Sequence, residues 1–131
     1  MFLAKSKPKL KQILIVEDNE DMQHMYRMFF SGHEDEYSIS IEGDPEQALK
    51  MISENEYDLV VLDIIMEPLP GDIIFTCMRA YKKTLFMPVL VVSVLDHEMF
   101  EHLKKMKNIN FLKKPITEEQ LLSKIKEILG N

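Results

Sequence analysis

Several residue types are scarce in this sequence, and each scarcity excludes a class of protein. A single cysteine among 131 residues excludes an internal disulfide framework and fits a reducing compartment. Four glycines and six prolines are too few for a collagen-like or low-complexity chain. No apolar run approaches the roughly 18 residues that cross a bilayer, or the roughly 7–15 of a signal peptide. We therefore expect a cytoplasmic protein with no membrane segment.

The charge balance is acidic, with 16 lysines and arginines against 22 aspartates and glutamates and a net charge of −6 at pH 7. Such a surface repels phosphate, so direct nucleic-acid binding is disfavoured. An apolar content of 46% argues against disorder, and the length suits one domain. We expect a single domain over residues 1–131, with the lysine-rich residues 1–11 as a flexible leader.

Short apolar runs recur along the chain and predict five strands. Three of them, over residues 13–16, 58–65 and 88–94, lack polar alternation, which is typical of strands buried on both faces. Residues 37–41 alternate and predict an edge or half-exposed strand. Residues 109–112 predict a short fifth strand.

Helical patterns follow each predicted strand. Helices are expected over about 20–31 and 72–83 and from Asp44, Asp96 and Thr117 onward. Asp44 and Pro45 suit the first two positions of a helix, and Thr117 with Gln120 forms a capping box. In the third helix, Ile74, Cys77, Met78 and Tyr81 are expected to face inward.

Five strand–helix pairs in alternation predict a doubly wound α/β fold, a (βα)5 three-layer sandwich with helices on both faces of a parallel sheet. The common small version of this architecture, the flavodoxin-like one, has strand order 2-1-3-4-5. Ligands of such sheets bind beyond the carboxyl ends of the strands. The residues that follow the strands are therefore the first candidates for a functional site.

Acids, a hydroxyl and an ammonium group follow four of the predicted strands: Glu17, Asp18, Asp63, Ser93 and Lys114. Three crowded carboxylates repel one another unless a cation lies among them, and an oxygen-seeking divalent ion such as Mg²⁺ suits them. The formal charges then sum to −3 + 2 + 1 = 0. A carboxylate in such a site can attack phosphorus and form an aspartyl phosphate, and a serine hydroxyl can donate a hydrogen bond to the bound phosphoryl group.

A small-molecule binder on the same architecture, such as a flavodoxin-like FMN protein, is an alternative. Such proteins need a phosphate-binding loop rich in serine, threonine and glycine after the first strand, whereas residues 17–20 here read Glu-Asp-Asn-Glu. Those acids would repel a nucleotide phosphate unless a metal intervened. A third alternative is a degenerate signalling domain that no longer accepts phosphate.

Four motifs together resemble the receiver domain of two-component response regulators, of the kind that includes chemotaxis regulators. They are ILIVEDNE (13–20), DLVVLDIIMEPLPG (58–71), PVLVVSV (88–94) and FLKKP (111–115), and they occur in the family's order and spacing. The resemblance covers about residues 11–130.

The resemblance implies a role for each site residue. Asp63 is the implied phospho-acceptor, and Mg²⁺ is the implied cofactor, bound by Glu17, Asp18, Asp63 and the backbone carbonyl of Ile65. Lys114 is the implied charge partner of the phosphoryl group, in preference to its neighbour Lys113. Ser93 is the implied switch hydroxyl. Phe111 is the implied switch aromatic, although it could equally be an ordinary core residue.

The resemblance also implies partners: a sensor histidine kinase or phosphotransfer protein upstream, and an output partner that binds the surface of residues 95–129, formed by the fourth helix, fifth strand and fifth helix. A phosphorylation-dependent homodimer is a further expectation. Some positions depart from the family pattern, chiefly Glu67, Pro68 and Pro70 in the loop after Asp63 and Val94 after Ser93. In the family, the positions that Ile65 and Leu95 occupy here flank the path by which water reaches the phosphorus. Both residues are apolar, so the resemblance implies slow autodephosphorylation. It implies no other catalytic activity.

Overall fold

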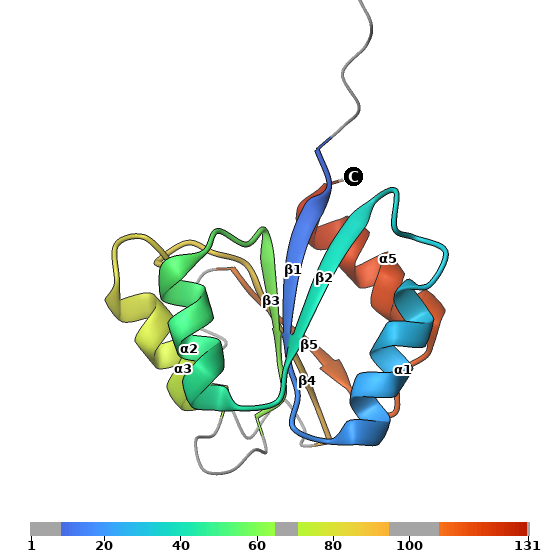
Figure 1. Ribbon diagram of the computed structural model, residues 1–131, viewed down its shortest axis with the longest axis horizontal. Helices are drawn as coiled ribbons and strands as arrows, with labels where there is room; N and C mark the ends of the chain where they lie inside the picture. The colour runs from blue at the N-terminus through green and yellow to red at the C-terminus, as the bar shows by residue number, and fades with distance from the viewer. Residues whose placement is uncertain (1–8, 65–70, 95–107, 131) are drawn as a thin grey trace, which may run out of the picture.

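The five strands form one parallel sheet at the centre of the molecule (Figure 1). The computed structural model describes residues 9–64, 71–94 and 108–130. The sheet order is β2-β1-β3-β4-β5, as the alternation of strands and helices predicts. The strands are β1 (Lys11–Val16), β2 (Tyr37–Glu42), β3 (Leu59–Leu62), β4 (Val89–Ser93) and β5 (Ile109–Lys113).

Helices cover both faces of this sheet, which confirms the three-layer prediction. The described helices are α1 (Glu20–Phe30), α2 (Pro45–Glu54), α3 (Gly71–Ala80) and α5 (Glu118–Leu129). Helices α1 and α5 lie on one face, and α2 and α3 lie on the other (Figure 1). The helix expected from Asp96 lies outside the described residues. Within the described residues, no helix has the length and apolar character that a bilayer span requires.

The side chains of β1 alternate between two separate hydrophobic cores. Ile13 and Ile15 pack with α1 and α5, whereas Leu14 and Val16 pack with α2 and α3. Every residue of β3 and β4 is also buried. Because both faces of these strands are covered, their sequences contain no polar alternation. The edge strand β2 retains the alternation, since only its first residue, Tyr37, is fully buried.

The expected helix starts at Asp44 and Thr117 are confirmed. The Asp44 carboxylate accepts a hydrogen bond of 2.9 Å from the backbone N–H of Glu46. Thr117 and Gln120 bond each other's backbone N–H groups reciprocally, at 2.9 and 3.1 Å. These contacts satisfy N–H groups that have no partner inside the helix.

Three expected boundaries are wrong. Lys11, assigned above to the leader, begins β1, where its N–H bonds the carbonyl of Glu36. Strand β3 ends at Leu62, before the predicted end at residue 65. Helix α3 ends at Ala80, and Tyr81, expected to face inward, is 66% exposed.

The early end of α3 is explained by Arg79. Its guanidinium donates hydrogen bonds to the carbonyls of Thr84 (2.9 Å) and Met87 (2.7 Å) and lies 4.5 Å above the ring centre of Phe75. One planar cation thus holds two carbonyls of the segment between α3 and β4. The chain turns beneath this cation and does not continue as a helix.

Removing the cap of α5 tests the fold directly. Thr117→Ala should lower the free energy of unfolding by about 1 kcal/mol, because an N–H of the first turn loses its partner. The measurement is urea denaturation. Ser123→Ala is the matched control: Ser123 is exposed within the same helix, and its loss should change stability by less than about 0.5 kcal/mol. Equal losses in the two variants would contradict the capping role.

Candidate functional site

Three carboxylates meet at the carboxyl end of the sheet. Glu17 and Asp18 follow β1, and Asp63 follows β3. Because Val16 pairs with Leu62 in the parallel register, the residues that come next lie side by side. One oxygen from each of the three carboxylates lies within 4.8 Å of the others. The expected convergence of these acids is therefore confirmed.

The three acids differ in burial. Glu17 is 1% exposed and Asp63 is 8% exposed, whereas Asp18 is open to solvent. Burial raises the pKa of Glu17, and the neighbouring Lys114 ammonium offsets part of that rise. The site therefore has a buried side, formed by Glu17 and Asp63, and an open side at Asp18.

Lys114 joins the two buried acids. Its Nζ lies 3.0 Å from Oε1 of Glu17 and 3.2 Å from Oδ2 of Asp63. The backbone N–H of Lys114 donates to the carbonyl of Ser93, which fixes the lysine beside the end of β4. The neighbouring Lys113 is exposed, so Lys114 is the lysine that the structure brings to the acids.

The ionised cluster of three carboxylates and one ammonium group has a net charge of −2. Its donor atoms are all carboxylate oxygens, the type that hard divalent cations prefer. The cluster therefore fits a divalent ion such as Mg²⁺, which would balance the remaining charge.

Hydrogen bonds to backbone groups fix the acidic loop between β1 and α1, residues 17–19. Gln23 of α1 donates a hydrogen bond of 2.6 Å from its side-chain amide to the carbonyl of Glu17. The N–H of Glu17 donates to the carbonyl of Glu42 at the end of β2. Asn19 caps α1 by accepting from the N–H of Met22 at 2.9 Å, while its own N–H donates to the Glu17 carboxylate. Sequence reasoning missed Gln23 and Asn19.

Two glycines allow close approaches at this site. A Cβ at Gly43 would lie 2.8 Å from the side-chain nitrogen of Gln23, so a larger residue would displace that amide. A Cβ at Gly71 would overlap the backbone carbonyl of Asp63. The N–H of Gly71 also donates to the carbonyl of Ile64 at 3.1 Å, which ties the start of α3 to the segment that carries Asp63.

Ser93 and Phe111 occupy neighbouring strands. Ser93 is 2% exposed at the end of β4, and Phe111 is half-buried in β5, opposite Val91. Phe111 packs against the core on the α2 and α3 face. Ile65, Leu95 and the loop with Glu67, Pro68 and Pro70 lie outside the described residues.

Comparisons with known proteins agree with this arrangement. Residues 13–126 match the family described as the response regulator receiver domain. The alkaline phosphatase synthesis transcriptional regulatory protein PhoP of Bacillus subtilis is 29% identical over 91% of this chain and 48% of its own length. Response regulator MprA of a Mycobacterium species is 30% identical over 90% of this chain and 50% of its own length. The chain thus spans about half the length of the curated relatives it matches.

Solved structures share the fold. The receiver domain of sensor histidine kinase PA1611 from Pseudomonas aeruginosa, described with a magnesium ion in its active-site cleft, superposes with a TM-score of 0.81 at 22% identity, over 94% of this chain and all of that one. The chemotaxis response regulator CheY4 of Vibrio cholerae gives 0.83 at 20% identity, over 92% of this chain and all of that one.

These matches favour the signalling alternative over FMN binding. Receiver domains act in two-component systems, where their partners are histidine kinases or phosphotransfer proteins, and they are signalling modules, not conventional enzymes. With residues 13–126 matched and the doubly wound sheet in place, this chain belongs to the response regulator receiver family.

Proposed function

We propose that Asp63 accepts a phosphoryl group from the phosphohistidine of a sensor histidine kinase or phosphotransfer protein. The observation that carries this proposal is the position of Asp63 beside Glu17 and Asp18 and 3.2 Å from the Lys114 ammonium. A cation beside a carboxylate is suited to neutralising the charge of an incoming phosphoryl group. The family match supports the same chemistry.

In the proposed transfer, a carboxylate oxygen of Asp63 attacks phosphorus as the bond from phosphorus to the donor nitrogen breaks. The electron pair of that bond leaves with the histidine, and an acyl phosphate forms on Asp63. Lys114 would then turn from the carboxylates toward the new phosphoryl oxygens. Positioning and charge neutralisation would account for most of the rate, because a carboxylate is itself the nucleophile.

Glu17, Asp18 and Asp63 are the proposed Mg²⁺ ligands, together with the backbone carbonyl of Ile65. Bound there, Mg²⁺ would supply positive charge against the phosphoryl oxygens. The chain's own part is to present carboxylate oxygens within 4.8 Å of one another and to keep Glu17 away from water.

The proposed output route runs through Ser93 and Phe111. Phosphorylation would draw the Ser93 hydroxyl toward the phosphoryl group, and Phe111 would turn inward. The surface of residues 95–129 would then bind an output partner or a second phosphorylated copy. The half-buried position of Phe111 beside the core is compatible with two orientations of the ring.

Three further proposals complete the assignment. Residues 1–131 form a single receiver domain, and the protein acts in the cytoplasm. The catalysis proposed for it is confined to its own phosphorylation and a slow autodephosphorylation, in which the apolar Ile65 and Leu95 would shield phosphorus from water.

The acceptor is tested with a small phosphodonor. Wild-type protein incubated with acetyl phosphate and Mg²⁺ should gain one phosphoryl group, measured by intact-protein mass spectrometry. Asp63→Asn should gain none, because an amide is a poor nucleophile toward phosphorus. Asp35→Asn, at an exposed turn after α1, is the control and should be labelled like wild type. Full labelling of Asp63→Asn would show that another residue is the acceptor.

Replacing the buried Glu17 should raise stability in the absence of metal and reduce the stabilisation by Mg²⁺. Because burial raises the pKa of Glu17 above its unfolded value, metal-free wild type should lose stability as the pH rises through that pKa. In EDTA at neutral pH, Glu17→Gln should therefore melt at a higher temperature than wild type. Added Mg²⁺ should stabilise wild type more than the variant.

The control for that comparison is Glu20→Gln, since Glu20 is an exposed acid at the start of α1. It should show no increase in melting temperature in EDTA and should keep the response to Mg²⁺. A Glu17→Gln variant that melts below wild type in EDTA would show that the buried charge of Glu17 does not destabilise the metal-free protein.

The hydrogen bond from the Gln23 side chain to the Glu17 carbonyl should affect Mg²⁺ affinity. Gln23→Met removes the hydrogen bond to the Glu17 carbonyl while keeping a side chain of similar length. We expect Mg²⁺ affinity, measured by calorimetry, to fall about tenfold, as is common when a group that orients metal ligands is lost. Gln47→Met on the exposed side of α2 is the matched control and should bind as wild type does. Unchanged Mg²⁺ affinity in Gln23→Met would show that this hydrogen bond does not orient the metal ligands.

A further inference from the structure

Three segments that are far apart in the sequence meet beside Glu17. The parallel register pairs Val16 with Glu42, so Gly43, which follows β2, lies beside Glu17, which follows β1. Gln23 of α1 reaches the same point, where its side-chain amide donates the 2.6 Å hydrogen bond to the Glu17 carbonyl. The size of residue 43 therefore bears on the loop that carries two of the three acids.

The Glu17 carbonyl matters for the metal because of the peptide unit to which it belongs. That carbonyl is part of the planar unit that joins Glu17 to Asp18, and both residues are proposed Mg²⁺ ligands. A rotation of this unit turns the backbone from which the two side chains project. The hydrogen bond from Gln23 therefore constrains the direction of two carboxylates at once.

Residue 43 is a glycine for reasons of space. Among the described residues, the glycines with positive φ are Gly32 and Gly130, so alanine can adopt the backbone of residue 43. An added Cβ would lie 2.8 Å from the side-chain nitrogen of Gln23, closer than such carbons approach other atoms in proteins. It would lie 3.4 Å from the Glu17 carbonyl oxygen, an ordinary contact. The Gln23 amide is therefore the group that must move.

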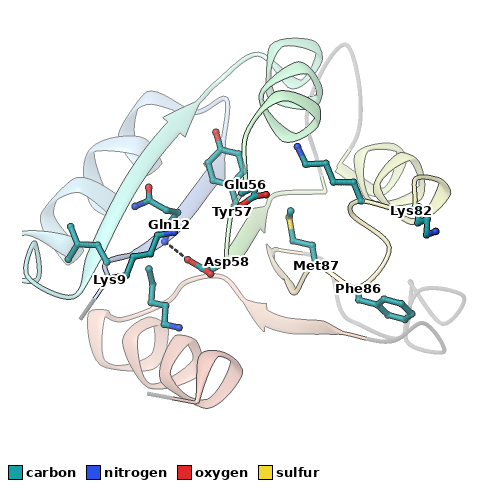
Figure 2. A pocket seen from close by; sticks show the side chains of 11 residues that line it. Lys9, Gln12, Glu56, Tyr57, Asp58, Lys82, Phe86 and Met87 are labelled. Atoms are coloured by element: carbon teal, nitrogen blue, oxygen red, sulfur yellow. Dashed lines mark hydrogen bonds between the residues drawn. The ribbon is translucent and has the colours of Figure 1, made fainter. Parts of the chain in front are cut away.

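Hydrogen bonds oppose a movement of the backbone around this contact. The Glu42 carboxylate accepts from the N–H of Asp44 at 3.0 Å, next to the cap of α2. At the start of β1, the N–H of Gln12 donates to the Asp58 carboxylate at 2.7 Å, as Figure 2 shows, and the N–H of Asp58 donates to the Gln12 carbonyl. The end of the Gln23 side chain, in contrast, turns about its own torsions. We therefore expect a Cβ at residue 43 to displace the amide and to spare the fold.

We propose that Gly43 is a positioning residue of the metal site, and that it favours Mg²⁺ by leaving room for Gln23 to hold the peptide between Glu17 and Asp18. This inference rests on the metal ligands proposed above. Mg²⁺ requires near-octahedral geometry, whereas Ca²⁺ accepts an irregular arrangement with longer bonds. A loss of fixed orientation should therefore weaken Mg²⁺ binding more than Ca²⁺ binding.

The test is a calorimetric titration of wild type and Gly43→Ala with Mg²⁺ and, separately, with Ca²⁺. Gly43→Ala should bind Mg²⁺ about tenfold more weakly than wild type, as is common when a group that orients metal ligands is lost. Its affinity for Ca²⁺ should fall less. Unchanged Mg²⁺ affinity, or an equal loss for the two cations, overturns the proposal.

A double-variant cycle tests whether Gly43 acts through Gln23. Gln23→Ala removes the amide that the new methyl group would displace. Because a single hydrogen bond is at stake, Gln23→Ala/Gly43→Ala should lose about tenfold in Mg²⁺ affinity, as each single variant does. Losses that multiply to about a hundredfold would show that the two residues act independently, and the proposal would fail.

Gln47→Ala is the matched background, since Gln47 is an exposed glutamine of α2. In that background Gly43→Ala should still lose about tenfold in Mg²⁺ affinity. In EDTA, adding Gly43→Ala to Gln23→Ala should raise the melting temperature slightly, because alanine restricts the unfolded chain and no amide remains to clash. A lower melting temperature there would show that the fold itself needs the glycine, which contradicts the positioning role.

A metal-free measurement separates this inference from the proposed function. In ¹⁵N-labelled protein without divalent cations, the side-chain amide signals of Gln23 and the backbone amide of Asp18 should differ between wild type and Gly43→Ala. If these signals coincide, the inference fails while the proposed metal site stands. If wild type itself binds no Mg²⁺, the proposed metal site fails and the inference fails with it.

Discussion

The ammonium group of Lys114 lies between two buried carboxylates, and the candidate site depends on that contact. Glu17 and Asp63 are largely withdrawn from water, where two negative charges repel each other and lack solvation. One lysine, 3.0 and 3.2 Å from the two acids, compensates only part of this charge. The remaining negative charge suits a divalent cation, which is the basis of the metal site and the phosphoryl acceptor proposed above.

The register of the parallel sheet brings Lys114 to the two buried acids. Parallel pairing aligns the ends of β1, β3, β4 and β5, so residues far apart in sequence arrive at one edge. Two cores, one on each face, bury the central strands that precede these residues. The contacts of Gln23 and Gly71 then fix the backbone on either side of the acids.

Sequence patterns predicted most of the fold because its strands are buried on both faces, as β3 and β4 illustrate, and its helix starts are chemically distinctive, as Asp44 and Thr117 illustrate. The convergence of Glu17, Asp18, Asp63 and Lys114 followed from their places at strand ends. The end of α3 was missed because it is set by Arg79 reaching carbonyls several residues ahead. Gln23 was missed because hydrophobic periodicity gives no information about a polar side chain that bonds the backbone of a neighbouring loop.

The central claim is that Asp63, beside Glu17, Asp18 and Lys114, is the phosphoryl acceptor of a metal-dependent site. The most direct measurement is a crystal structure with Mg²⁺ and beryllofluoride, which mimics a phosphoryl group on a carboxylate. We expect beryllofluoride on Asp63, the metal against Glu17 and Asp18, and the Lys114 ammonium turned toward the fluorides. Beryllofluoride on another carboxylate, or a metal bound away from these acids, would contradict it.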